Sequence, residues 1–411
     1  MPSRLSVNIC ARCKGVHRLC GRIRCPILER FRVHIGLKLD SSEVFGASPS
    51  VFVGEFGYPR VKAGPMIPPT TDTEYAKLHD DPQSWYGKSI EEIVELRSRL
   101  IRSNIVLDTR SILRGGKGIE AIQDVALSAR PIGSEAKFTK PLKPRLTFNG
   151  VTAPIGPTGM AESIRIVENP YVPRKIYQIV GDGDVKTYNA VGELYTWGFT
   201  PYYIIKILTA GLLGQARERR LVPTRWGITA IDSMLGDYLL EKVKEFREID
   251  EIILYSNSYL DNHYYILMLP DTYAFEMVEI WLPRTVWVKD EKPYIIENFE
   301  LYDGKWRKED VNGGYKAMRF TVIEHMYRIR RQAAVFSIRE VGEGYYAPLG
   351  VWNVREGMRR AFENKALKFG DVDEALKYIS SNLKTPFKEW YKEAKIPKMF
   401  KLQKKIISFL D

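Results

Sequence analysis

The sequence predicts an α+β protein: a body of helices and antiparallel sheet, with a four-cysteine zinc knot at its N-terminus and a helical C-terminal region that ends in a short tail. Three observations predict this. Hydrophobic residues make up 45% of the 411 residues, which is enough for a large core and excludes a disordered chain. Strand-like and helix-like hydrophobic patterns both recur along the body. All four cysteines fall between positions 10 and 25.

The chain carries 62 Lys and Arg against 50 Asp and Glu, a net charge of +12. A basic folded protein indicates a polyanionic partner, with nucleic acid first and an anionic membrane surface second. The alternative is the charge-rich surface of a thermophile protein. No run of about 18 apolar residues exists, and the basic N-terminus lacks the apolar stretch of a signal peptide. We therefore expect a soluble cytoplasmic protein with no membrane partner.

The cysteine spacing predicts a structural zinc site. Cys10 and Cys13 have the two-residue gap that lets two thiolates reach one tetrahedral ion, and Cys20 and Cys25 form a second, looser pair. Four thiolates close the coordination sphere, so His17 is expected not to bind the metal. The alternative is two disulfides, which an intracellular location disfavours.

In the first half of the body, residues 31–39 alternate like a strand, and residues 51–58 predict a buried strand that ends in a turn. Ser89 and Glu92 form the pattern of a capping box at the start of a helix. The basic glycine turn at 114–118 precedes another short helix.

The second half begins after a loop-rich stretch at 140–160, where the body could subdivide. Further along, the patterns predict a hairpin at 175–191, a helix at 202–220 with a basic end, a helix reaching about 246, antiparallel strands over 251–288, and helices at 316–331 and 350–366. The expected organisation is a zinc-binding segment at 1–40, a body at 41–370, a Lys-rich helical region at 371–402 and a tail at 403–411.

The tail matches a peptide that binds the sliding clamp PCNA. Gln403 is followed at fixed spacing by Ile406, Phe409 and Leu410. In one turn of 3₁₀ helix the three apolar side chains would project together into a pocket on the clamp, while Gln403 would hydrogen-bond beside them. The alternative is the end of an ordinary amphipathic helix.

Two internal blocks complete a family resemblance. The four-cysteine N-terminus, the block at 56–65 (FGYPRVKAGP), the block at 223–232 (PTRWGITAID) and the terminal clamp peptide together resemble the archaeal Nre DNA-repair family. The resemblance covers essentially the whole chain. It implies a role in DNA-damage repair, interaction with PCNA and an archaeal cytoplasm near the nucleoid. It implies no particular reaction, because no catalytic assignment accompanies it.

Candidate chemistry in the body centres on Arg225, Thr229 and Asp232, which could serve phosphoryl transfer with Mg²⁺ or Mn²⁺. Alternatively, Thr229 caps a helix and Asp232 lies in its first turn. Further carboxylates that could join them are Asp182, Asp184 and Glu324, the last beside His325. For these, an Asp-Gly turn and a solvated basic helix face are the simpler interpretations.

Two arginine clusters are candidate phosphate contacts: Arg217, Arg219, Arg220, Arg328, Arg330 and Arg331. Aromatic residues such as Trp197 and Tyr203 could stack on unpaired bases or belong to the core. The sequence holds no Walker loop, GxGxxG or HExxH motif. ATP-driven, dinucleotide-dependent and zincin chemistries therefore lack support. Together with the family resemblance, the sequence predicts a DNA-repair protein that binds DNA and is recruited by PCNA, with a metal-dependent nuclease, a non-catalytic adaptor and a zinc-knot RNA-associated protein left open.

Overall fold

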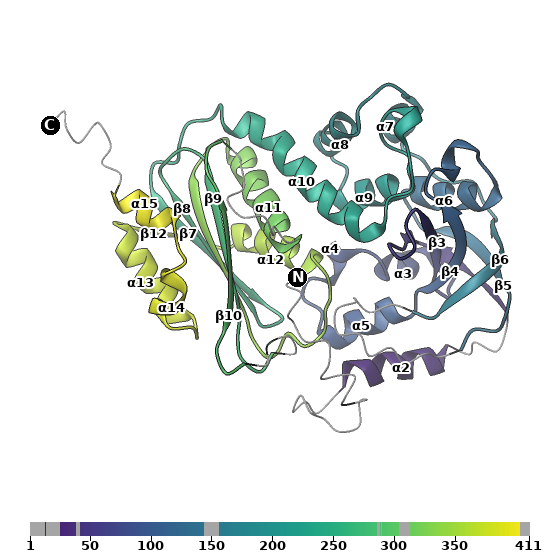
Figure 1. The fold of residues 1–411 in the computed structure, drawn as a ribbon, viewed down its shortest axis with the longest axis horizontal. Helices are drawn as coiled ribbons and strands as arrows, with labels where there is room; N and C mark the ends of the chain where they lie inside the picture. The colour runs from purple at the N-terminus through teal and green to yellow at the C-terminus, as the bar shows by residue number, and fades with distance from the viewer. Residues whose placement is uncertain are drawn as a thin grey trace. The chain divides into compact units, whose positions relative to one another are not determined.

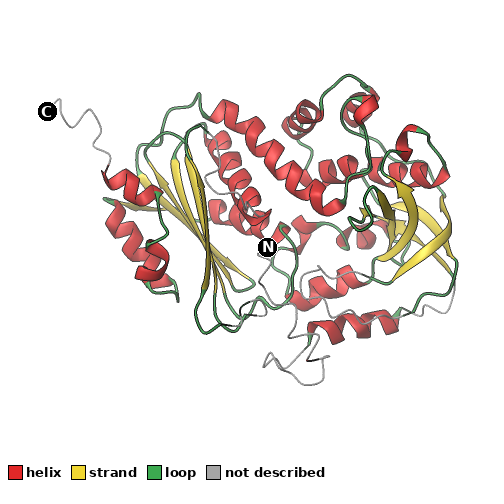
Figure 2. Ribbon diagram, viewed as in Figure 1, coloured by secondary structure: helices red, strands yellow, loops and turns green. Residues whose placement is uncertain are grey.

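The computed structural model describes residues 13, 25–37, 42–143, 156–285, 288, 290–303 and 313–402 (Figure 1). The chain divides into two compact units, with the boundary between Tyr238 and Leu239. We refer to the described residues before this boundary as the N-terminal unit and to those after it as the C-terminal unit. Each unit contains helices and a six-stranded sheet, so the predicted α+β class is confirmed (Figure 2). Within the described residues, no helix is both long enough and apolar enough to cross a membrane.

The sheet of the N-terminal unit has the order β1-β5-β6-β4-β3-β2. Its neighbours pair antiparallel except β4 and β6, which run parallel. Ala47 in β1 donates its N–H to the carbonyl oxygen of Thr70, just past β3, at 2.7 Å, so the sheet curves back on itself. The strands are β1 (Glu43–Ser48), β2 (Ser50–Val53), β3 (Arg60–Ile67), β4 (Ile101–Asp108), β5 (Ile132–Phe138) and β6 (Thr158–Ile166).

The helices of this unit surround the sheet, and local signals explain several of their ends. The Ser89 hydroxyl accepts from the Glu92 N–H while the Glu92 carboxylate accepts from the Ser89 N–H, so the predicted capping box is confirmed. The described helices are α2 (Pro26–Gly36), α3 (Thr73–Leu78), α4 (Pro82–Trp85), α5 (Ile90–Ser98), α6 (Lys117–Leu127), α7 (Arg174–Gly181), α8 (Thr187–Thr196), α9 (Pro201–Thr209) and α10 (Thr224–Val243), which crosses the unit boundary.

Two predicted β segments in this unit are wrong. The strand expected at 31–39 falls largely in α2, where Pro26 occupies the first turn and suits a helix start. The hairpin expected at 175–191 is the helix pair α7 and α8, joined by residues 182–186. Buried Ile176 and Ile179, three residues apart, mark the helical period there.

The helix expected at 202–220 ends early. Helix α9 stops at Thr209, and Gly211 and Gly214 follow with φ of +73° and +99°. These left-handed conformations end a helix and favour glycine. The basic residues beyond them lie in a short 3₁₀ turn (Ala216–Glu218) and the segment after it, not at a helix C-terminus.

The sheet of the C-terminal unit has the order β10-β9-β11-β8-β7-β12. The predicted antiparallel pairing is confirmed for β7 and β8, but β8 does not pair with β9. Strand β11 lies between them, antiparallel to β8 and parallel to β9, because the chain returns through a helix before forming β11. The strands are β7 (Ile252–Tyr259), β8 (Asn262–Leu269), β9 (Ala274–Trp281), β10 (Tyr294–Glu300), β11 (Ala334–Val341) and β12 (Leu367–Phe369).

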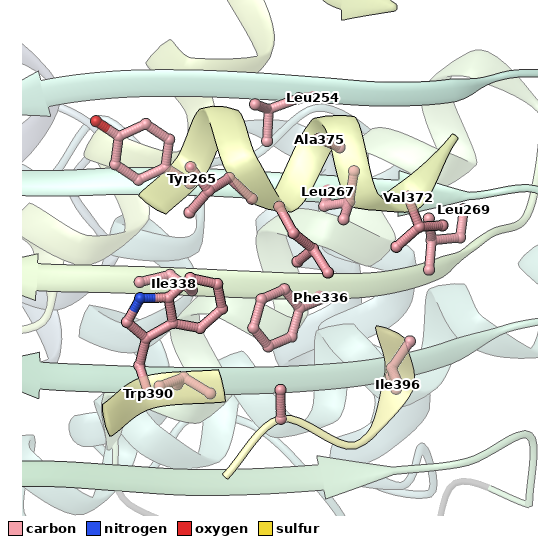
Figure 3. Packing of buried hydrophobic residues seen from close by; sticks show 14 of the residues in the cluster. Leu254, Tyr265, Leu267, Leu269, Phe336, Ile338, Val372, Ala375, Trp390 and Ile396 are labelled. Atoms are coloured by element: carbon pink, nitrogen blue, oxygen red, sulfur yellow. The ribbon is translucent and has the colours of Figure 1, made fainter. Parts of the chain in front are cut away.

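Helices cover both faces of this sheet (Figures 1 and 2). On one face lie α11 (Gly313–Ile329) and α12 (Trp352–Glu363); on the other lie α13 (Val372–Asn382), α14 (Phe387–Tyr391) and α15 (Ile396–Leu402). Figure 3 shows Leu267, Phe336 and Ile338 from the strands packed against Ala375 and Trp390 from the second helix layer. The apolar sides of these Lys-rich helices therefore form part of one core.

Two buried carboxylates attach the segment that carries α14 and α15. Glu276 of β9 accepts hydrogen bonds from the N–H groups of Lys395 and Ile396, the shortest at 2.7 Å. Glu340 of β11 accepts from the N–H groups of Lys384 and Thr385, each at 2.9 Å. These bonds satisfy main-chain donors where the segment meets the sheet.

A buried ion pair lies at the sheet edge on the α11 side. The Glu300 carboxylate accepts from Arg319 Nε at 2.7 Å and from the hydroxyls of Tyr273 and Tyr315 at 2.5 and 3.1 Å. The Glu300 side chain is fully buried, and that of Arg319 is 3% exposed. Such a pair is tolerated in a core only when its atoms are hydrogen-bonded, as these are.

Candidate nucleic-acid interface

Two blocks that lie far apart in the sequence meet on the surface of the N-terminal unit. The turn after β2 contributes Glu55, and the start of α10 contributes Arg225 and Trp226. Glu55 accepts from Arg225 Nη1 through one carboxylate oxygen and from Trp226 Nε1 through the other, both at 3.2 Å. The hydroxyl of Thr224 also accepts from the N–H of Val53 at 3.0 Å. The blocks at 56–65 and 223–232 are therefore parts of one surface.

The turn itself presents aromatic rings to solvent. Phe56 is 87% exposed, Tyr58 is 42% exposed and Trp226 is 46% exposed. The ring centroids of Tyr58 and Trp226 lie 5.1 Å apart at an angle of 45°. Gly57 has φ of +86°, and a Cβ there would meet the Arg60 carbonyl oxygen at 2.7 Å. Glycine is thus required for the turn that places Phe56 and Tyr58 on either side of it.

Basic side chains adjoin these rings. Arg60 and Lys62 are exposed on the same side of β3, because side chains two apart on a strand face the same way. The N–H of Thr109 donates to the Pro59 carbonyl oxygen at 2.9 Å, which brings exposed Arg110 beside the turn. We call Phe56, Tyr58, Arg60, Lys62, Arg225 and Trp226 the aromatic–basic surface.

The three residues considered for catalysis share one helix but not one environment. Arg225 is exposed and paired with Glu55 at 3.2 Å. Thr229 donates its hydroxyl to the Arg225 carbonyl oxygen at 3.4 Å. Asp232 is 1% exposed. Thr229 and Asp232 lie in the second and third turns of α10. The alternative interpretation, in which Thr229 caps the helix, is therefore wrong. Catalysis by these residues stays a prediction.

The other carboxylates considered for catalysis have hydrogen-bond partners of their own. Asp182 Oδ1 accepts from the N–H groups of Asp184 and Val185, which makes it a local turn residue. Glu324 binds the guanidinium of Arg359 through both oxygens, each at 2.8 Å. Among the described residues, no group of three or more His, Cys, Asp and Glu side chains is arranged to hold a metal ion.

His325 is buried beside Glu324. Its ring stacks on Phe362 with centroids 3.9 Å apart, and its Nδ1 lies 3.1 Å from Arg328 Nη2. Burial, with the nearby Arg328 charge, lowers the pKa of His325 to about 3. His325 is therefore neutral at physiological pH and behaves as a core residue.

The predicted arginine clusters separate into two kinds. Arg219 donates three hydrogen bonds to the carbonyl oxygens of Gly214, Val180 and Asp182, at 2.7 to 2.9 Å. Its guanidinium therefore joins the segment after α9 to the end of α7. Arg220 pairs with Glu218 at 3.3 Å. All six stay predicted DNA contacts; among the remaining four, Arg217, Arg328 and Arg330 are exposed, and Arg331 is half-buried.

The predicted zinc and clamp sites fall largely outside the described residues. Of the four cysteines, Cys10 and Cys20 lie outside, whereas Cys13 is buried and Cys25 directly precedes α2, each with a free thiol. The clamp residues Gln403, Ile406, Phe409 and Leu410 all lie outside.

Family models match nearly the whole chain. The model described as "Archaeal Nre, N-terminal" matches residues 19–288, and "Archaeal Nre, C-terminal" matches residues 300–409. The chain belongs to the archaeal Nre family. The resemblance drawn from the sequence is confirmed. No solved structure matches this Nre-family chain.

Three curated relatives of this Nre-family protein match over most of their lengths. DNA repair protein NreA of Archaeoglobus fulgidus is 37% identical over 381 residues, covering 93% of this chain and 95% of the relative. DNA repair protein NreB of the same organism is 32% identical, covering 95% and 97%. DNA repair protein NreA of Haloferax volcanii is 36% identical, covering 87% and 88%.

Sequence reasoning singled out Arg225 but missed the binding potential of Phe56, Tyr58 and Trp226. The available signal was an aromatic pair around a glycine in a turn. A core aromatic is seldom placed at the tip of a turn, because little protein surrounds it there.

Proposed function

We propose that this Nre-family protein acts in DNA repair, binding DNA through the aromatic–basic surface and recruited to PCNA by the peptide at 403–411. The relatives named as DNA-repair proteins support the biological role. The observation that carries the DNA-binding part is the joining of exposed aromatic rings to exposed cations by the Glu55 contacts to Arg225 and Trp226. The net charge of +12 agrees with a polyanionic ligand.

DNA binding should depend steeply on salt and on the cations of this surface. Each phosphate contact on duplex DNA contributes about 0.9 to the slope of log affinity against log salt. Replacing Arg60 and Lys62 together by alanine should reduce the slope by roughly 1.8 and weaken binding to all DNA sequences alike. Fluorescence anisotropy with a labelled duplex, measured over a salt series, gives this slope.

The matched control is Lys140→Ala, which removes an exposed lysine just past the end of β5. It should leave the slope unchanged. If the Arg60/Lys62 double variant keeps the wild-type salt slope, DNA binds at another surface of the protein. Absence of binding even at low salt would overturn the DNA-binding proposal and favour a charge-rich surface without a nucleic-acid partner.

Whether the bound DNA is also cut needs a separate measurement. Incubation of plasmid or branched DNA with Mg²⁺ or Mn²⁺ distinguishes a nuclease from an adaptor. If the predicted residues act, Asp232→Asn should stop cleavage and spare DNA binding. Because Asp232 is buried, the unfolding midpoint of this variant must be measured beside its activity.

We also propose that Cys10, Cys13, Cys20 and Cys25 hold one structural zinc ion, since four thiolates suit a closed tetrahedral site. Metal analysis of the pure protein should give one zinc per chain. Cys13→Ser should lower both zinc content and thermal stability, because binding the metal stabilises the folded state. A zinc-free protein with two disulfides by mass would contradict the assignment.

A further inference from the structure

We propose that the aromatic–basic surface binds unpaired bases of single-stranded DNA by stacking, in preference to intact duplex. This inference rests on the proposed function, and it names the form of DNA that this surface takes. It follows from the exposure of the aromatic rings, from the contacts that fix two of these rings and from the positions of the neighbouring cations.

The exposed ring faces find no open base to stack on in an undistorted duplex. Phe56 at 87% exposure contributes little to any core, and Tyr58 and Trp226 are also exposed. In duplex DNA each base face is covered by its neighbours, so a protein meets only phosphates and groove edges. Unpaired bases offer open faces, and aromatic side chains stack on any of them with little sequence preference. Exposed aromatic rings beside cations are therefore suited to a single strand.

Two of the three rings, those of Tyr58 and Trp226, are held in place before any ligand arrives. Trp226 is fixed by its Nε1 bond to Glu55 and by contact with the Tyr58 ring. The start of α10 is fixed to β2 by the bond between Thr224 and Val53. Ordering a side chain on binding costs free energy, so rings that are already positioned bind more tightly.

Positively charged side chains lie beside the rings, where the sugar–phosphate backbone of a strand with stacked bases would pass. Arg60 and Lys62 continue along β3 from the turn that bears Tyr58, and Arg110 lies beside it. The acidic groups nearby are Glu55 and Asp108. Glu55 is paired with Arg225, and Asp108, opposite Arg60 in the β3–β4 register, accepts the N–H of Arg110 through Oδ1 at 2.9 Å. Lys62 and Arg110 remain as cations for the negative backbone of a strand.

The decisive comparison uses three probes of equal length: an oligodeoxythymidylate, a single strand of abasic sites and a blunt duplex. The full chain should bind oligodeoxythymidylate more tightly than the abasic strand, by roughly 5- to 150-fold for each stacked base. Phe56→Ala should remove most of this ratio, while its affinity for the abasic strand stays the same. Because Phe56 is exposed, this variant should fold normally.

Two further variants localise the effect. Tyr177→Ala removes another exposed ring of the N-terminal unit, on α7, and should leave the ratio unchanged. The chain has eight tryptophans, so quenching of Trp226 is obtained as the difference between the wild type and Trp226→Phe on adding oligodeoxythymidylate. We expect Trp226→Phe to lose the larger part of the quenching.

The outcomes separate this inference from the function on which it rests. Equal affinity for oligodeoxythymidylate and the abasic strand, or tighter binding of duplex, would overturn stacking and leave DNA binding intact. A loss with Tyr177→Ala as large as that with Phe56→Ala would overturn the assignment to this surface. Failure to bind any of the three probes would overturn both proposals.

Discussion

Replacing Arg319 by methionine is expected to unfold the C-terminal unit at temperatures where the wild type stays folded. The change leaves the Glu300 carboxylate in the core without the Arg319 cation, while the Tyr273 and Tyr315 hydroxyls still donate to it. Removing one member of a buried ion pair costs about 3–5 kcal/mol. That is a large part of the roughly 5–15 kcal/mol that stabilises a typical domain. Denaturant unfolding followed by circular dichroism measures the loss.

A matched exposed pair provides the control. Arg360 and Glu363 form an ion pair of 2.6 Å in the last turn of α12, with side chains 45% and 50% exposed. Arg360→Met should cost less than about 1 kcal/mol, because water already solvates both charges. Adding Glu300→Gln to Arg319→Met should restore part of the lost stability by removing the unpaired charge. Equal losses for the Arg319 and Arg360 variants would contradict the role given to burial.

Phe409→Ala is expected to abolish binding to PCNA. In a short peptide most of the binding free energy comes from a few buried anchors, and the proposed anchors are Ile406, Phe409 and Leu410. Deleting residues 403–411 should have the same effect. Calorimetric titration of PCNA with each variant measures the affinity.

The control within the same peptide is Ser408→Ala, which changes a position between the anchors and should leave the affinity near that of the wild type. The unfolding midpoint should stay the same in all these variants, because the substitutions lie past α15. Wild-type affinity of the Phe409 variant would refute the clamp peptide.

The features of the fold that could be predicted from sequence are those with local causes. The capping box at Ser89 and Glu92 depends on residues three apart, and the β7–β8 hairpin depends on two strands joined by a short turn. The helices at 175–191 were missed because an Asp-Gly turn can join helices as well as strands. The parallel pairing of β9 with β11 could not be predicted, because its cause is a long return of the chain through α11.

The candidate site also depends on contacts between residues far apart in the sequence, which local patterns do not predict. Arg225 stood out in its own block, but its partner Glu55 is 170 residues away, and no local pattern joins them. The exposure of Phe56 is likewise a property of the folded turn and not of its sequence. The zinc and clamp assignments depend on spacing alone, and they stay predictions.

The attachment of the last helices by Glu276 and Glu340 has a mechanical consequence. These carboxylates hold the segment leading to α15 on the sheet, and α15 ends at Leu402, one residue before the clamp peptide. From Leu402 to the first apolar anchor, Ile406, the chain spans at most roughly 14 Å when fully extended. If the tail binds PCNA as proposed, this length would keep the end of α15 within roughly 14 Å of the bound Ile406, so the C-terminal unit would stay close to the clamp surface.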